Sequence, residues 1–127
     1  MPLTPIASAG RRLYNEDVHE MAITQSVIEA VAERSGGRPV TRVTLVIGTL
    51  SGVVADSVRF CFDLATSGTA LEGATLEIVE VRGRARCRDC GDEVELPDFL
   101  ALCTCGSADL EILAGEELTV ASAEVAA

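Results

Sequence analysis

Apolar side chains recur at helical spacing in two segments of this chain. In residues 19–34 they fall three and four positions apart, which places them on one face of a helix, and a Ser-Gly-Gly turn ends the segment. The apolar face of this first helix comprises Ile23, Val27, Ala30 and Val31. Residues 55–66 repeat the spacing, with Asp56 or Ser57 as the expected cap. The apolar face of the second helix comprises Val58, Cys61, Phe62 and Ala65.

Three other segments carry patterns that predict β-strands. Residues 42–47, RVTLVI, are apolar on both sides of the alternation, so we expect a strand that is largely buried on both faces. Residues 75–81 and 116–125 alternate apolar and polar side chains and predict two further strands. Helices and strands in this order predict an α+β fold in which two helices lie on a small mixed sheet.

The first seventeen residues fit neither pattern. Residues 1–17, MPLTPIASAGRRLYNED, contain two prolines and a glycine but no helical or strand period. The pair Arg11-Arg12 is followed by polar and acidic residues instead of the apolar run that a secretory or twin-arginine signal needs. We therefore expect residues 1–17 to be a disordered tail, and the protein to be cytoplasmic.

Composition narrows the class of protein further. Hydrophobic residues make up 48% of the 127 residues and charged residues 24%, which excludes a chain that is disordered throughout. Aromatic residues make up only 3%, so the core must be built from aliphatic side chains. The net charge of −10 would repel phosphates, and no apolar stretch is long enough to cross a bilayer. We therefore expect neither nucleic acid nor a membrane as a partner.

Four of the five cysteines stand in two close pairs. Cys87 and Cys90 form a C-x-x-C pair, Cys103 and Cys105 form a C-x-C pair, twelve residues separate the two pairs, and a glycine follows each pair. Two tight turns at this separation can direct four thiolates at one tetrahedral Zn²⁺ ion, and a site with four sulfur ligands is closed and therefore structural. The fifth cysteine, Cys61, lies on the apolar face of the second helix and is expected in the core.

Other uses of the paired cysteines are weaker alternatives. A reducing cytoplasm disfavours disulfides, a redox C-x-x-C would lack its usual βαβ setting, and an iron–sulfur cluster is a further alternative. The C-x-C pair is one residue shorter than the usual zinc knuckle, which leaves the geometry of that turn open. Residues 83–114 contain few large apolar side chains, so a metal must replace a hydrophobic core there.

Four arginines alternate at the start of the cysteine-containing segment, and they are Arg82, Arg84, Arg86 and Arg88. We expect a solvated strand whose positive charges offset the negative charge of a zinc tetrathiolate. A more specific alternative is that these arginines form a docking patch for an acidic partner. Nucleic-acid binding is the weakest, because stacking aromatic residues are absent and the rest of the chain is acidic.

Six short stretches occur in an order that is specific as a set. They are V-H-E-M-A-I-T-Q-S-V, V-x-L-x-I-G-x-L-S, R-F-C-F-D-L-A, L-E-G-A-T-L-E-I, C-R-D-C and C-G-S-A-D-L-E-I-L-A-G-E-E-L. This arrangement closely resembles the HypA/HybF family, the nickel metallochaperones of hydrogenase maturation. The resemblance extends from Val18 to about Val125, whereas neither the His-Glu pair nor the C-x-x-C motif would be specific alone.

The resemblance implies a nickel site at the start of the first helix. Chains of this family begin Met-His-Glu, and their terminal amine, backbone amides and first imidazole can hold Ni²⁺, which favours a square of nitrogen donors. Here the imidazole is that of His19, Glu20 follows it, and Val18 stands at the initiator position. All ten basic residues are arginine, which is typical of a GC-rich genome, so we expect translation to start at a GTG codon at Val18, where it would be read as Met. With residues 1–17 attached, His19 would offer a looser site of imidazole and amides.

The resemblance also implies two modules and a set of partners. Residues 18–82 and 115–127 would form a nickel-binding module, into which residues 83–114 are inserted as a zinc-ribbon module. The protein would not be an enzyme but a carrier with Ni²⁺ as transient cargo and Zn²⁺ as a structural ion. Its partners would be the GTPase HypB and the precursor of the [NiFe]-hydrogenase large subunit, and some relatives also serve urease maturation. The alternative is a zinc-ribbon adaptor that binds a protein or nucleic acid and has no nickel role.

Overall fold

The first sheet joins strands that are far apart in the sequence. It contains β1 (Val40–Gly48), β2 (Thr75–Val81) and β6 (Leu118–Val125), in the order β2-β1-β6. β2 runs parallel to β1 and β6 runs antiparallel to it, so the sheet is mixed. These strands come from a computed structural model that describes residues 20–98 and 100–126. All three strands expected from the sequence are present.

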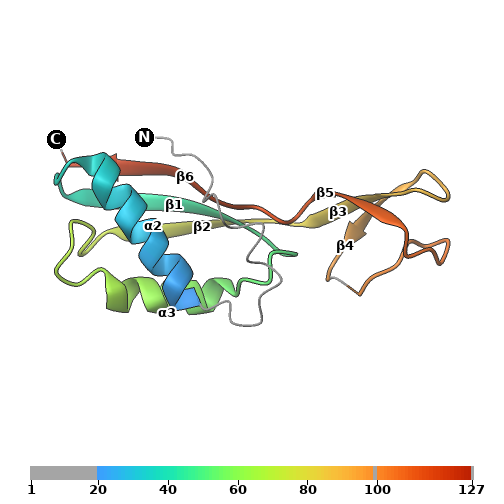
Figure 1. The fold of residues 1–127 in the computed structure, drawn as a ribbon, viewed down its shortest axis with the longest axis horizontal. Coiled ribbons are helices and arrows are strands. Elements are labelled where there is room, and N and C mark those ends of the chain that lie inside the picture. The colour runs from blue at the N-terminus through green and yellow to red at the C-terminus, as the bar shows by residue number, and fades with distance from the viewer. Residues whose placement is uncertain (1–19, 99, 127) are drawn as a thin grey trace.

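Both expected helices are also present, and they cover one face of the first sheet (Figure 1). α2 (Glu20–Ser35) buries one face, and this face includes the polar residue Thr24. Ala30, which was expected on the buried face, is exposed. α3 (Ala55–Ala65) buries Val58 and Phe62. No helix among the described residues combines the length and hydropathy that a membrane-spanning helix requires.

The expected cap of α3 is wrong. Val54 stands at the N-cap position in an extended conformation, with φ −89° and ψ 115°, and no side chain caps the helix there. Asp56 instead lies in the first turn, where its carboxylate pairs with Arg59 one turn later at 2.8 Å. The helix therefore begins one or two residues before the polar residues that the sequence offers as caps.

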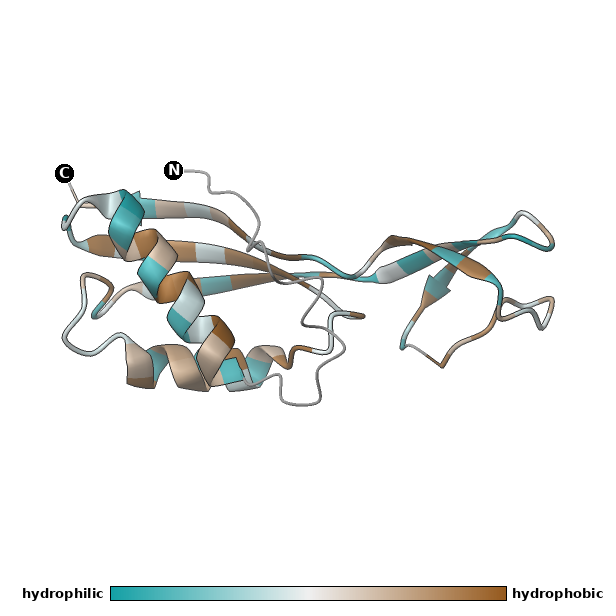
Figure 2. Cartoon of the chain, viewed as in Figure 1, coloured by the Kyte–Doolittle hydropathy of each residue, from teal (hydrophilic) through white to brown (hydrophobic). Residues whose placement is uncertain are grey.

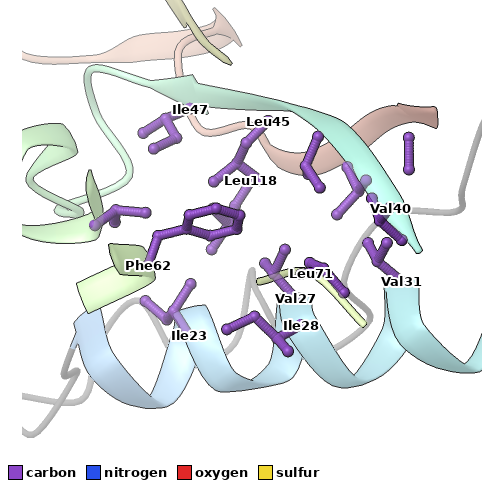
Figure 3. Close-up of a cluster of buried hydrophobic side chains, with 14 of the residues drawn as sticks. Ile23, Val27, Ile28, Val31, Val40, Leu45, Ile47, Phe62, Leu71 and Leu118 are labelled. Atoms are coloured by element: carbon purple, nitrogen blue, oxygen red, sulfur yellow. The ribbon is translucent and has the colours of Figure 1, made fainter. Parts of the chain in front are cut away.

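The main core lies between the two helices and β1. Leu45 and Ile47 of β1 and Leu118 of β6 face Phe62 of α3 and Val27 of α2 across this space (Figure 3). The core is aliphatic apart from Phe62, as the composition predicts. Burial of these side chains removes apolar surface from water and supplies the main stabilisation of this part of the fold.

Burial of the central strand differs from the expectation of two covered faces. The helix-facing residues of β1 are buried, but Thr44 and Val46 on the other face are only half-buried. The reason is that α2 and α3 both pack on the same face of the sheet. Cys61 is likewise half-buried and lies outside the core cluster, so its expected place in the core is also wrong.

The second sheet is antiparallel and lies at the other end of the molecule (Figure 1). It contains β3 (Gly83–Cys87), β4 (Glu93–Leu96) and β5 (Leu110–Ala114), in the order β4-β3-β5. Hydrophilic residues dominate β4 and much of β3, whereas hydrophobic residues gather in the first sheet and the helices (Figure 2). Its small apolar cluster is built on Leu50, Ala85 and Leu96.

This arrangement confirms the predicted α+β class, with two helices on a small mixed sheet and a second, inserted cysteine-containing part. The chain leaves the first sheet after β2 and returns to it at β6. The division into residues 18–82 plus 115–127 and residues 83–114 as separate modules stays a prediction.

Candidate metal centre

The structure brings the four paired cysteines together at the tip of the second sheet. Their Sγ atoms all lie within 4.8 Å of one another. The shortest approaches join the two pairs, with 3.7 Å between Cys87 and Cys105 and 3.6 Å between Cys90 and Cys103. Two sulfurs from each turn therefore face two from the other, as the spacing of the pairs predicts.

Each pair of cysteines sits on a tight turn that ends in a glycine. Gly91 donates its N–H to the carbonyl oxygen of Cys87 at 2.9 Å, and Gly106 donates to that of Cys103 at 2.8 Å. Both glycines have a positive φ, 83° and 91°, which glycine adopts without the strain that a side chain would cause. The shorter C-x-C pair thus forms a turn that closes in the same way as the C-x-x-C pair.

A hydrogen bond between side chains joins the two turns. The hydroxyl of Ser107 donates to the carboxylate of Asp89 at 2.5 Å, and it also accepts the backbone N–H of Asp109 at 3.0 Å. This pair is not among the residues predicted from the sequence. The signals for it are an aspartate inside the first cysteine pair and a serine directly after the glycine of the second turn.

The spacing of the sulfurs fits a tetrahedral zinc ion. Ligands at about 2.3 Å from Zn²⁺ at the corners of a tetrahedron lie roughly 3.8 Å apart, close to the two shortest distances found here. A disulfide would need sulfurs about 2.05 Å apart, and all described cysteines are free. Cys87 and Cys103 are buried while Cys90 and Cys105 are exposed, so the site lies at the surface with one side packed.

The thiols of Cys87 and Cys90 differ in acidity because their hydrogen-bond partners differ. The N–H groups of Cys90 and Asp89 donate to the sulfur of Cys87 and lower its pKa from 9.0 to about 7. At Cys90 the N–H of Asp92 lowers the pKa, but the thiol of Cys103 and the other sulfurs outweigh it and raise the pKa to about 12. The protein alone therefore favours the thiolate of Cys87 and disfavours that of Cys90, and a bound cation would displace thiol protons from the cluster.

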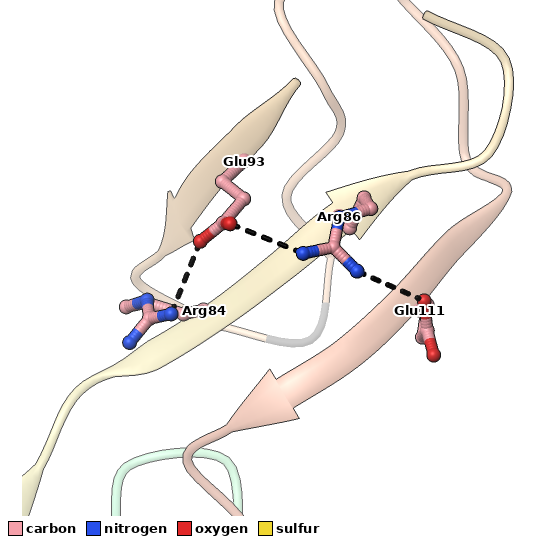
Figure 4. Close-up of polar contacts among 4 residues, drawn as sticks. All are labelled: Arg84, Arg86, Glu93 and Glu111. Atoms are coloured by element: carbon pink, nitrogen blue, oxygen red, sulfur yellow. Dashed lines mark hydrogen bonds and ion pairs between the residues drawn. The ribbon is translucent and has the colours of Figure 1, made fainter. Parts of the chain in front are cut away.

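The alternating arginines of the second sheet all have carboxylate partners. Arg84 and Arg86 share Glu93 of β4 at 3.1 and 3.2 Å, and Arg86 also reaches Glu111 of β5 at 3.8 Å (Figure 4). The outer two arginines follow the same rule, in the pairs Arg82–Glu95 and Arg88–Asp109. None of the three interpretations from the sequence named these partners, which neutralise the arginines within this part of the chain.

The other predicted site lies where α2 begins. Val18 and His19 fall outside the described residues, and Glu20 is the first described residue of α2. The Oε2 atom of Glu20 accepts the backbone N–H of Val54 at 3.2 Å, which links the first turn of α2 to the start of α3. A shallow hollow of about 460 Å³ adjoins this contact, lined by Glu20, Met21, Asp56, Ser57, Phe60 and Cys61.

Comparison with known proteins identifies the family. The family described as "Hydrogenase/urease nickel incorporation, metallochaperone, hypA" matches residues 18–125. The hydrogenase maturation factor HypA of Rippkaea orientalis is 54% identical over 109 residues, which cover 85% of this chain and 96% of that protein. The HypA of Geotalea uraniireducens is 49% identical and is covered over 99% of its length.

Solved structures agree on the fold. The solution structure of the Ni metallochaperone HypA from Helicobacter pylori has a TM-score of 0.57 at 22% identity, with 85% of this chain and 97% of that one covered. A second structure, "Solution structure of HypA protein", has a TM-score of 0.58 at 24% identity and is covered over 96% of its length. With a family match over nearly the whole chain and relatives at this level of identity, the chain belongs to the HypA family, which comprises metallochaperones for nickel incorporation and not enzymes.

Proposed function

We propose that this chain carries Ni²⁺ for the maturation of a [NiFe]-hydrogenase. The cation would be transient cargo, held at the start of α2 and passed in the cytoplasm to the large-subunit precursor with the help of the GTPase HypB. The observation that carries this proposal is the match to a nickel-incorporation family, which begins at residue 18 and so includes the His-Glu pair. Because the family description names urease as well, delivery to urease maturation proteins is a second use of the same site.

The donors of the nickel site would be nitrogens of three consecutive residues. His19 would supply its imidazole, and Val18, His19 and Glu20 would supply main-chain nitrogens, a set that suits the square-planar preference of Ni²⁺. Glu20 would act through its backbone, because its side-chain Oε2 is already engaged by the N–H of Val54. An open set of nitrogens on a chain end can release its ion, as delivery requires.

The full nickel site also requires a free amine at Val18. The family match starts at this residue, and the two HypA relatives described above are covered over 96% and 99% of their length. They therefore have no room for a counterpart of residues 1–17, which supports translation from Val18. Intact-mass spectrometry of the protein from its native host should give a chain that begins at residue 18, and a mass that includes Met1 would contradict this start.

Zinc would occupy the four-cysteine site permanently. Cys87, Cys90, Cys103 and Cys105 present four sulfurs at suitable distances, which is the donor set that Zn²⁺ favours in structural sites. When bound, the ion supplies a cross-link between the two turns. The second sheet has only a small apolar cluster, so this cross-link would replace the missing core.

Calorimetric titration with Ni²⁺ tests the cargo role directly. Tag-free protein that starts at residue 18 should bind about one Ni²⁺ per chain, and His19→Ala should lose this binding while its zinc content stays unchanged. Arg34→Ala, in the last turn of the same helix, is the matched control and should leave both metals in place. Normal nickel binding by His19→Ala would show that His19 is not a ligand.

A zinc-ribbon adaptor is the second candidate, and one surface feature favours it. A hollow of about 340 Å³ lies beside the second sheet, and its lining includes the exposed side chains of Leu100, Leu102 and Ile112. Exposed apolar groups of this kind are typical of surfaces that bind another protein. The same titration separates the two functions, since an adaptor would ignore Ni²⁺ in the form that starts at residue 18.

A further inference from the structure

Leu50 belongs to one part of the chain and packs in another. It lies in the loop between β1 and α3, which are both elements of the first sheet and its helices. Its side chain is only 1% exposed and is buried with Ala85 and Leu96 of the second sheet. It is therefore an apolar side chain that reaches from the first part of the fold into the second.

Two glycines lie close to the side chain of Leu50. Gly83 starts β3, and a Cβ placed on it would lie 2.7 Å from Cδ1 of Leu50. Gly115 follows β5, and a Cβ placed there would lie 3.0 Å from the same atom. The two connections also lie close to their neighbours, because a Cβ on Gly115 would lie 2.5 Å from Cα of Gly83, and one on Gly83 would lie 2.7 Å from the carbonyl oxygen of Leu96. Glycine at both positions therefore lets the two connections and Leu50 pack closely together.

Main-chain hydrogen bonds hold the loop to both connections. The N–H of Leu50 donates to the carbonyl oxygen of Gly115 at 2.7 Å, and the N–H of Thr49 donates to that of Val81 at 2.9 Å. The hydroxyl of Thr49 accepts the N–H of Gly83 at 3.0 Å. The loop therefore bridges the strand that leaves the first sheet and the strand that returns to it.

The other end of the same loop reaches the start of α2. Val54 lies four residues after Leu50, and its N–H donates to the carboxylate of Glu20 at 3.2 Å. Between them, the Ser51 hydroxyl is buried and accepts the N–H of Val53 at 3.2 Å, so the loop is internally bonded and short. A shift of Leu50 would have to be absorbed within these few residues.

We propose that Leu50 locks the second sheet in a fixed orientation on the first, and that residues 50–54 make the start of α2 depend on this lock. Two single-strand connections alone would allow the second sheet to swivel, because the strands that carry them pair in different sheets. The inserted side chain and its hydrogen bonds remove that freedom. The proposal rests on packing and does not depend on nickel binding.

Nuclear magnetic resonance relaxation of the zinc-loaded protein tests the lock. Amide ¹⁵N relaxation should give one rotational diffusion tensor for both sheets in the parent chain and two different ones in Leu50→Ala. Leu71→Ala is the matched control, since Leu71 is also fully buried but packs in the main core, and it should keep a single tensor. A single tensor in Leu50→Ala, with zinc retained, would overturn the proposal.

Amide hydrogen exchange tests the link to α2. Leu50→Ala should speed the exchange of the Val54 amide at least tenfold, and removal of zinc with a chelator should do the same in the parent chain. In Leu50→Ala, removal of zinc should add little, because the link is already broken. If the folded Leu50→Ala protein exchanges this amide at the parent rate, residues 50–54 do not transmit the packing of the second sheet.

A second variant guards against loss of folding. Leu50→Val shortens the same side chain less and should shift both measurements in the same direction by a smaller amount. Gly83→Ala would press on both Leu50 and the carbonyl oxygen of Leu96, so only the part of its effect on Val54 exchange that acts through Leu50 should disappear in the Leu50→Ala background. Additive effects of these two substitutions would count against direct contact as the basis of the lock.

Discussion

The carboxylate of Glu20 accepts the backbone N–H of Val54 across 3.2 Å, and this one contact joins the first turn of α2 to the residue that precedes α3. Glu20 therefore has a structural partner directly beside the proposed nickel donors. A side chain in this position can influence nickel binding without touching the ion, because it fixes the backbone that carries the next nitrogens.

Substitution of Glu20 separates positioning from ligation. Glu20→Gln keeps an oxygen that can accept the N–H of Val54, whereas Glu20→Ala removes it. We expect Glu20→Ala to weaken Ni²⁺ binding severalfold and Glu20→Gln to stay near the parent affinity, in calorimetric titrations of the form that starts at residue 18. Equal loss in both variants would instead indicate that the charged carboxylate binds the ion.

Substitution of a cluster cysteine should remove the structural metal. Cys87→Ser breaks the set of four sulfurs, so we expect loss of zinc and poor solubility of the protein, as measured by elemental analysis of the purified chain. Cys61→Ser provides the matched control, with the same chemical change at a half-buried cysteine on α3. Full zinc content in Cys87→Ser would contradict the four-thiolate assignment.

Two phenylalanines of α3 should differ sharply in their contribution to stability. Phe62 is 2% exposed in the main core, so Phe62→Ala should lower the free energy of unfolding by about 3–5 kcal/mol. Phe60, two residues earlier, is 66% exposed, so Phe60→Ala should lower it by less than about 1 kcal/mol. Urea unfolding of the zinc-loaded proteins measures both. Similar losses would mean that the outer face of α3 is covered.

The ion pairs of the second sheet should make a small and salt-sensitive contribution. The hydrogen bonds from Arg84 and then Arg86 lower the pKa of Glu93, so its contribution is complete above the ordinary carboxyl value and is lost as the pH falls through the lowered value. We therefore expect Glu93→Gln to lower the melting temperature slightly and equally between pH about 6 and about 8. The difference should shrink in roughly 1 M salt, because salt screens exposed charges.

Glu95→Gln serves as the control for this prediction. Glu95 pairs with Arg82 alone, at 2.8 Å, whereas Glu93 is shared by two arginines, so the effect of Glu95→Gln should be smaller. If the effect of Glu93→Gln is as large in high salt as in low salt, packing of the side chain accounts for it and the charges do not.

Much of this fold could be predicted because its signals are local. The spacing of Val27 and Val31 defines a helix face, and the alternation through Leu45 and Ile47 defines a strand, without knowledge of the rest of the chain. The clustering of the four paired cysteines was predictable for the same reason, since their spacing along two turns is a local property. These residues are where the structure and the sequence agree.

The remaining features depend on contacts between distant segments. Leu50 is a single apolar residue in a turn, and the residues next to it in the sequence do not indicate that it packs against Ala85 of the second sheet. Cys61 has helical spacing that fits the core, but α3 is rotated so that Val58 and Phe62 take the buried positions. The cap at Val54 is set by the loop geometry and by Glu20, and neither is visible in local preference.

The insertion of the second sheet between β2 and β6 also has a consequence for biosynthesis. β6 emerges from the ribosome after the second sheet, yet it brings Leu118 and Val120 to the same hydrophobic interior as β1. The ends of the intervening segment must come together before β6 can pair with β1, and closing a long flexible loop costs entropy. An ion that holds the four sulfurs together shortens the flexible part of this segment and so lowers the entropy cost of bringing its ends together. We expect cells starved of zinc to accumulate newly made chains with an incomplete first sheet, which is exposed to proteases.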